Sequence, residues 1–271
     1  MMKLTEGLIR VYVAALILLI YSPIIVMIVL SFNTSGRISF PMEGFTTKWY
    51  NGVPTGYEYA SYISAFYDWK FWIAFQNTVY VAFAAAIMTF IIVTAVAMAL
   101  RHRLVGRDPL FYLILLGFIL PGVALGLGNN ILFRIMNWEF TWWTAAMLDT
   151  VYAVPFGLIL MMARFDPDLV LYERAASVLR ASPWSVFRKV TFPLIRWEAA
   201  SAGIFGFVLA WGELIRTSFV MRGTGVISTY ISTELAINPL TPKWYAVGTI
   251  VTGISIIALL IMGYVMARGQ R

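Results

Sequence analysis

Six long apolar runs constrain the fold of this chain more than any other feature of its sequence. They cover residues 8–30, 71–100, 110–133, 141–163, 199–220 and 244–267. A helix needs about 20 apolar residues to cross the roughly 30 Å hydrocarbon layer of a bilayer, so each run can form one span. The runs are continuous and do not alternate with a period of two, which argues against a transmembrane barrel. The sequence therefore predicts an all-α, polytopic membrane protein with six transmembrane helices.

The rest of the composition excludes several kinds of site. Only 12% of the residues are charged. We expect the whole chain, residues 1–271, to form a single transmembrane domain. The chain has no cysteine and one histidine, His102, which is too few ligands for a zinc site. No G-x-x-x-x-G-K-[ST] sequence is present to bind nucleotide phosphates. No metal, nucleotide or other cofactor is expected on this chain.

The distribution of basic residues predicts the orientation in the membrane. With the N-terminus inside, thirteen Lys and Arg residues fall in inner segments and six in outer segments, while Arg216 lies inside a span. The outer six are Arg37, Lys48, Lys70, Arg134, Arg222 and Lys243. Cytoplasmic loops carry the excess of positive charge. We therefore expect both termini and segment 164–198 in the cytoplasm. The net charge of +7 is then a topology signal, and nucleic acid is not an expected partner.

Segment 164–198 has the features of a docking element. Asp166-Pro167 and Ser182-Pro183 each combine a helix cap with a first-turn proline, which predicts two short helices. Phe192-Pro193 is expected to end the second helix. The first helix carries an apolar face formed by Leu171, Ala175 and Leu179. A loop that only enforced topology would need neither caps nor an apolar face. We therefore expect a soluble partner to dock here.

At these residues the sequence resembles the permease subunits of binding-protein-dependent ABC importers. Their cytoplasmic signature is E-A-A, three residues, G, nine residues, I-x-L-P. Here Ala175-Ala176, Arg180, Val190 and Phe192-Pro193 fall on the two alanines, the glycine, the isoleucine and the final pair. The glutamate position is taken by Arg174, with Glu173 one residue earlier.

Other parts of the chain extend the resemblance. "FWIAFQNTVYVAF" (71–83) is similar to the start of the second helix in this family, and "LPGVALGLG" (120–128) to the helix that follows. "AWGELIRTSFV" (210–220) resembles a fifth-helix segment of the spermidine/putrescine branch, where a D-E-F-x-R-T-like string is common. Glu213, Arg216 and Thr217 match that string, whereas Gly212 and Leu214 do not.

The resemblance implies a transport subunit of the bacterial cytoplasmic membrane that forms half of a solute pathway. Its implied partners are ABC ATPase subunits, a second permease expected to be a different chain, an external solute-binding protein and membrane lipid. The residues implied in coupling to the ATPase are Glu173, Arg174, Ala175, Ala176, Arg180, Ala181, Ser182, Val190 and Pro193. Two questions stay open: which acid meets the ATPase, and whether Arg180 adopts the left-handed conformation of the family's glycine, at a cost of roughly 1 kcal/mol or more.

Charged residues within the spans are candidates for the solute pathway, because charge at membrane depth is costly and usually faces a cavity or a partner. They are Asp149, Glu213 and Arg216. Glu213 and Arg216 are three residues apart and can form a structural ion pair or contact solute. Asp149 has no basic residue within one turn, so its partner is on another helix, in a solute or in water.

These residues leave the solute undecided between two classes. Asp149, Glu213 and Trp211 suit a small organic amine such as putrescine or spermidine, through ion pairing and cation–π contact. Arg216 favours a carboxylate-bearing amine or an amino-acid-like solute, unless Glu213 neutralises it. A membrane-embedded enzyme that uses Asp149 and Glu213 is a further alternative. A secondary transporter is disfavoured because the six spans show no inverted duplication.

Overall fold

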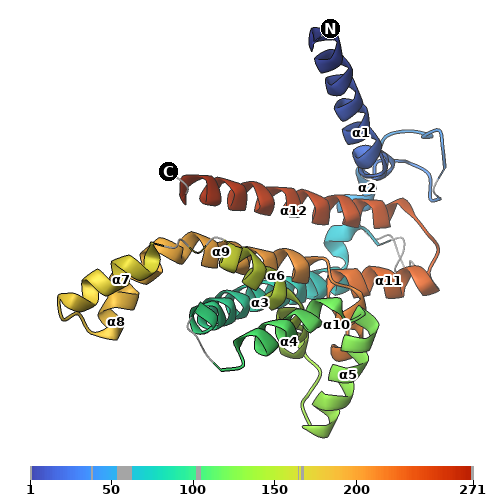
Figure 1. Cartoon of the computed structure of the whole chain (residues 1–271). Helices are drawn as coiled ribbons and strands as arrows, with labels where there is room; N and C mark the ends of the chain where they lie inside the picture. The colour runs from blue at the N-terminus through green and yellow to red at the C-terminus, as the bar shows by residue number, and fades with distance from the viewer. Residues whose placement is uncertain are drawn as a thin grey trace. The chain divides into compact units, whose positions relative to one another are not determined.

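The computed structural model describes residues 2–37, 39–53, 63–101, 105–163, 165 and 168–269, and almost all of them lie in helices (Figure 1). The elements are α1 (Met2–Leu30), α2 (Lys48–Asn51), η2 (Ala65–Tyr67), α3 (Trp69–Arg101), α4 (Arg107–Ile119), α5 (Gly122–Ile135), α6 (Trp142–Ala163), α7 (Leu169–Val178), α8 (Pro183–Val186), η3 (Phe187–Thr191), α9 (Phe192–Trp211), α10 (Ile215–Val220), α11 (Ile227–Ile237) and α12 (Pro242–Gly269). Within the described ranges the β-type pairing is an isolated bridge between Asn33 and Phe45.

The helices form two compact units. The first unit consists of Met1–Trp72 and Ile231–Leu260, and the second of Ile73–Tyr230 and Ile261–Arg271. Elements α4 to α10 belong entirely to the second unit. The candidate charged residues Asp149, Glu213 and Arg216 and segment 164–198 therefore belong to the second unit.

The predicted membrane-spanning helices are present as five long apolar helices and one bent pair. The five cover Gly7–Leu30, Trp69–Arg101, Trp142–Ala163, Pro183–Trp211 and Pro242–Leu260. The pair is Arg107–Ile119 with Gly122–Ile135. If this pair is counted as one span, the described part of the chain has six candidate spans. The all-α, six-span prediction is confirmed, although two spans differ from their predicted form.

The third predicted span, 110–133, is not one straight helix. Its two halves, α4 and α5, are bent by 105°. The cause lies at Leu120 and Pro121, because a residue before proline avoids the helical region and proline cannot donate a backbone hydrogen bond. Leu120 is extended, with φ −65° and ψ 135°, and Pro121 follows with φ −55° and ψ 136°.

The fifth predicted span, 199–220, begins earlier and ends earlier than the sequence indicated. Phe192-Pro193 does not end a helix, because η3 is a π-helical turn that continues into α9 with Pro193 in the first turn of α9, where proline is tolerated. The helix ends at Trp211 and Gly212. Glu213 then accepts the backbone N–H of Arg216 at 2.8 Å, which satisfies a donor in the first turn of α10.

The core of the second unit depends on close packing of α3, α6 and α9. Helices α6 and α9 lie side by side (Figure 1). A Cβ added to Gly157 of α6 would be 2.9 Å from the side chains of Ala202 and Val93, and one added to Gly206 of α9 would be 2.9 Å from the Ala85 carbonyl oxygen of α3. Without a hydrophobic driving force between helices in lipid, small residues at such contacts provide much of the packing.

Replacing Gly206 by alanine should destabilise this core. The new methyl group would be 2.6 Å from Thr89 Oγ1 as well as close to the Ala85 backbone, and overpacking of this kind costs about 1–3 kcal/mol. We expect a lower apparent Tm for the detergent-purified complex. Gly128→Ala is the matched control, since no atom lies within 4 Å of an added Cβ there. A Gly206→Ala Tm equal to that of the control would contradict this packing.

The first unit contains two ion pairs that the sequence analysis counted only as outer charges. Lys243 Nζ lies 2.7 Å from Asp68 Oδ2, and the lysine side chain is fully buried. Asp68 also accepts backbone N–H groups of Lys70 and Phe71 at the start of α3. Lys70 Nζ lies 3.2 Å from Glu234 Oε1 of α11. These contacts join the start of α3 to the start of α12 and to α11 within this unit.

Candidate functional site

Two interrupted helices of the second unit meet at one place. α5, which follows the break at Leu120-Pro121, packs against α10, which follows the end of α9. A Cβ added to Gly122, the first residue of α5, would be 3.6 Å from Arg216 Cγ. Asn130 of α5 donates its side-chain amide to the carbonyl oxygen of Phe219 in α10. Non-helical backbone at membrane depth is buried in protein or lines a cavity, and interrupted helices often mark a solute site.

Two buried charged side chains, Asp149 and Arg216, and the half-buried Glu213 meet at this junction. Arg216 donates to Glu213 Oε2, and its Nε lies 3.5 Å from Asp149 Oδ1 of α6. Thr217 Oγ1 donates to Asp149 Oδ2 at 3.4 Å. The guanidinium carbon lies 3.7 Å from the centre of the Tyr152 ring. The 3.5 Å separation is longer than a hydrogen bond, so the Asp149–Arg216 pair is a charge contact. One arginine is thus held by two carboxylates and an aromatic face, and we name these five residues the charged cluster.

The charged cluster answers part of what the sequence left open. Asp149 has its partner on another helix, and Glu213 and Arg216 form an ion pair. Sequence reasoning missed Tyr152, and it named Thr217 only as a match to the branch string and not as a partner of Asp149. Tyr152 follows Asp149 by three residues on α6, a spacing that places two side chains on one helix face. That spacing was the available signal, whereas nothing in the sequence linked Thr217 to Asp149.

Access to the charged cluster is uneven. Asp149 is 1% exposed and Arg216 is 6% exposed, whereas the Glu213 side chain is 12% exposed. Trp211 packs elsewhere, with its ring 5.4 Å from Phe207 and 6.3 Å from Phe75 between centroids. Its role in the pathway stays a prediction. Across the described ranges, no group of three or more His, Cys, Asp or Glu side chains could hold a metal ion. The chemistry available here is ion pairing and aromatic contact.

The turn between α7 and α8 has the geometry that a glycine usually provides. Arg180 adopts φ 60°, the left-handed conformation. The Arg180 N–H bonds the Ser177 carbonyl at 3.0 Å, and the Ala181 N–H bonds the Ala176 carbonyl at 3.3 Å, which is the Schellman pattern. Arg180 therefore adopts the strained conformation, at a cost of roughly 1 kcal/mol. Ser182 then caps α8 by accepting the Ser185 N–H at 3.3 Å.

Glu173 makes contacts inside the chain. It accepts from Arg101 at the end of α3 and from Thr191 in η3, both at 2.5 Å. These contacts fix α7 to α3 and to η3, which continues into α9. Arg174, at the family's glutamate position, is exposed. The predicted start at Asp166-Pro167 lies outside the described residues, and α7 begins at Leu169.

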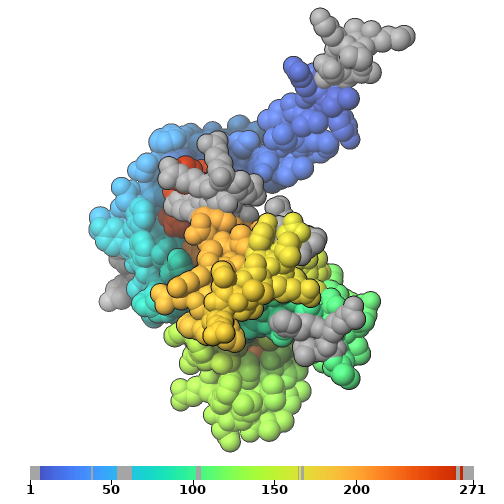
Figure 2. Space-filling model, turned by 60° about the vertical axis from the view of Figure 1, so that its left-hand side comes forward, coloured from blue at the N-terminus to red at the C-terminus, as the bar shows by residue number. Residues whose placement is uncertain are grey.

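The helix pair α7–α8 exposes large apolar side chains. The exposed fractions are 81% for Val178, 83% for Leu179 and 67% for Trp184, and Leu171 is also exposed. Figure 2 shows the yellow and orange atoms of this pair at the surface of the molecule. Of the other predicted coupling residues, Ala175 and Pro193 are exposed, whereas Ala176, Ala181 and Val190 are half-buried. An exposed apolar patch of this kind is typical of an interaction surface. We name Leu171, Val178, Leu179 and Trp184 the α7–α8 surface.

Comparisons with known proteins agree with this architecture. The spermidine/putrescine transport system permease protein PotC of Escherichia coli (strain K12) is 25% identical over 260 residues, which cover 96% of this chain and 93% of PotC. The putrescine transport system permease protein PotI of the same strain is 24% identical and covers 93% of this chain and 88% of PotI. A bacterial ABC transporter involved in the import of the acidic polysaccharide alginate has the same fold, with a TM-score of 0.68 over 98% of this chain and 96% of the matched chain, at 17% identity.

The family comparison identifies the class of protein. The family described as the binding-protein-dependent transport system inner membrane component matches residues 91–269. Its members are permease components that work with separate ATPase subunits, a second permease and a solute-binding protein. The enzyme alternative is therefore wrong. The chain belongs to this family and is a multi-pass, inner-membrane permease subunit of a bacterial ABC importer.

Proposed function

We propose that this chain forms half of the solute pathway of an importer for a small organic amine such as putrescine or spermidine. The proposal rests on the observation that Arg216 already has partners within the chain. Its guanidinium is already held by Glu213, Asp149 and the Tyr152 ring. The side chain that would bind a carboxylate-bearing solute therefore has partners within the chain. The names of PotC and PotI support the same solute class.

The formal charges of the cluster also favour a cation. Asp149 and Glu213 bring two negative charges and Arg216 one positive charge, which leaves one negative charge at a place where two helices are interrupted. Glu213 is the most accessible of the three. An ammonium group entering the pathway would meet that carboxylate first and gain a charge-assisted hydrogen bond. Trp211, whose ring stacks with Phe207 away from the cluster, would supply an aromatic face elsewhere along the pathway.

The same proposal includes the orientation of the chain. Both termini and segment 164–198 lie in the cytoplasm, as the excess of basic residues indicates. α6 has 22 residues and at 1.5 Å per residue is about 33 Å long, enough to cross the bilayer. The loop before α6 and the segment α7–η3 after it therefore lie on opposite sides. The whole chain, residues 1–271, acts as one transport domain beside a second permease that is a different chain.

Coupling to the ATPase takes place at α7 to η3. The α7–α8 surface provides the apolar contact, with Arg174, Ala175, Ala176, Arg180 and Ala181 around it. Glu173, Ser182, Val190 and Pro193 hold this element together and join it to α9. In this arrangement Glu173 positions α7 through Arg101 and Thr191, and Arg174 is an exposed charged side chain that can meet the partner.

Replacing Glu213 by glutamine tests the solute class. The change keeps the size of the side chain and removes the accessible negative charge. We expect at least about a tenfold higher KM for putrescine or spermidine uptake, since a charge-assisted hydrogen bond contributes about 1.5–3 kcal/mol. The measurement is uptake of labelled putrescine, spermidine and a carboxylated amine by the reconstituted complex. Asp108→Asn is the control, because Asp108 is an exposed acid in the first turn of α4.

Two results would separate the candidate solutes. Import of both polyamines by the wild-type complex, weakened in Glu213→Gln and unchanged in Asp108→Asn, agrees with the proposal. Import of the carboxylated amine alone would make the polyamine assignment wrong and favour an amino-acid-like solute.

A further inference from the structure

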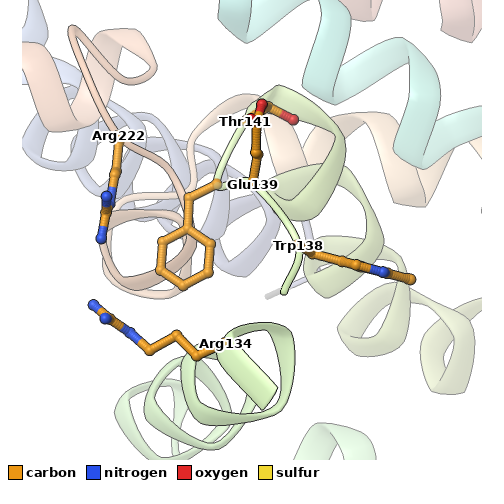
Figure 3. Close-up of a pocket in the computed structure, with 6 residues that line it drawn as sticks. Arg134, Trp138, Glu139, Thr141 and Arg222 are labelled. Atoms are coloured by element: carbon orange, nitrogen blue, oxygen red, sulfur yellow. The ribbon is translucent and has the colours of Figure 1, made fainter. Parts of the chain in front are cut away.

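An open cavity of about 400 Å³ lies at the end of the second unit where α5 stops and α6 begins. It is lined by Arg134, Trp138, Glu139, Phe140, Thr141 and Arg222. Arg134 belongs to the last turn of α5. Residues 138–141 lie between α5 and α6, and Arg222 follows α10. In Figure 3, the ends of the Arg134 and Arg222 side chains lie on the same side of the drawn ring, whereas Trp138 points away.

The two arginines are fixed on one aromatic side chain. The guanidinium carbon of Arg134 lies 5.4 Å from the centre of the Phe140 ring, and that of Arg222 lies 5.3 Å from it. Arg134 Nε also donates to Asn130 Oδ1 at 2.9 Å. The two guanidinium carbons are therefore no more than about 11 Å apart. Such an arrangement positions two sets of N–H donors around one opening before any ligand arrives.

Neither arginine has a carboxylate partner within the described part of the chain. Glu139 lines the cavity but forms no ion pair with Arg134 or Arg222 in those residues. Arg134, Glu139 and Arg222 are all exposed. The cavity therefore keeps a formal excess of one positive charge together with an aromatic wall. An anionic group is the complementary ligand, and arginine pairs with carboxylates through two parallel hydrogen bonds.

We propose that this cavity receives an acidic side chain of the external solute-binding protein and so serves as a docking site on the outer face. The proposal rests on the orientation proposed above, which places the loop before α6 and the segment after α10 outside. A cationic solute would be repelled by two arginines that have no carboxylate partner in the described part of the chain, so the cavity is not part of an amine pathway. The binding protein, a partner of this family, must be recognised on the outer side. Arginine and aromatic residues are enriched among the few interface residues that contribute most of the binding energy.

The test measures docking directly. The complete importer in lipid nanodiscs is titrated with the fluorescently labelled solute-binding protein of the same transport system, at several salt concentrations. Arg134→Gln and Arg222→Gln are each expected to weaken binding by about tenfold and to make its salt dependence shallower. Arg37→Gln is the matched control, because Arg37 is an exposed arginine of the other unit and should leave binding unchanged. Unchanged apparent Tm values show that the variants are folded.

Two outcomes would overturn the docking site. One is wild-type binding by both Arg134→Gln and Arg222→Gln. The other is saturable binding of sodium glutarate to the wild-type importer, if Arg134→Gln or Arg222→Gln abolishes this binding and leaves docking of the binding protein unchanged. The cavity would then be a site for small anions.

The proposed function is tested separately from this site. Docking of the binding protein is measured independently of the solute that is carried. If the complex imports no polyamine but the arginine variants still lose docking, only the solute assignment is contradicted. A cysteine at Thr224 should react with an impermeant maleimide added outside intact cells, and one at the exposed Val178 should not. The reverse labelling would overturn the orientation and, with it, the docking site.

Discussion

Replacing Arg216 by glutamine is expected to destabilise the second unit and to abolish uptake. Arg216 is the basic partner of both Asp149 and Glu213, and Asp149 is 1% exposed. Removing one partner of a buried ion pair leaves an uncompensated charge and costs about 3–5 kcal/mol. The change also removes the contact with Tyr152. The measurements are the apparent Tm of the purified complex and uptake of labelled solute.

A double variant separates the loss of the ion pair from other effects. Asp149→Asn combined with Arg216→Gln removes both members of the pair across α6 and α10, so most of the lost stability should return. Arg196→Gln, an exposed arginine that lies over the Trp197 ring, is the control for losing a guanidinium on the same part of the chain. If Arg216→Gln were as stable as Arg196→Gln, the charged cluster would not contribute to the fold.

Replacing Leu179 by aspartate is expected to abolish ATP hydrolysis stimulated by the solute-loaded binding protein. Leu179 is 83% exposed at the end of α7, so the change should leave insertion and folding intact. In the assembled importer the side chain would be buried against the ATPase, where an unpaired carboxylate costs several kcal/mol. The readouts are stimulated ATP hydrolysis in nanodiscs and retention of the ATPase during purification.

The control at this position is Leu179→Met, which keeps an apolar side chain of similar volume and should cost less than about 1.5 kcal/mol. Full stimulation in Leu179→Asp would mean that the α7–α8 surface does not meet the ATPase. Loss of stimulation in both variants would point to a structural defect of the helix pair, because methionine preserves the apolar contact.

Local features of the structure were largely predictable from the sequence. The apolar runs predicted the spans, because the bilayer requires a minimum length of apolar helix whatever the helix packs against. Ser182-Pro183 predicted the start of α8, since a cap and a first-turn proline act within one helical turn. The spacing of Glu213 and Arg216 predicted their ion pair for the same reason. Pro193 was misjudged because a π-helical turn before it allows the helix to continue.

Contacts between distant residues were decided only by the tertiary structure. Asp149 and Arg216 are 67 positions apart, and Arg134 and Arg222 both lie over the ring of Phe140, which precedes α6. A helix in a membrane presents apolar residues both to lipid and to other helices, so its pattern does not say which face meets which partner. The break at Leu120-Pro121 was not predicted from the sequence, and the contact of α5 with α10 depends on close packing, such as that of Gly126 against the Phe219 side chain. The sequence by itself determined how many helices cross the membrane, because the bilayer sets the length of an apolar span, and where α8 begins, because a cap acts within one turn. Only packing between helices placed the charged side chains together, because that depends on which surfaces fit.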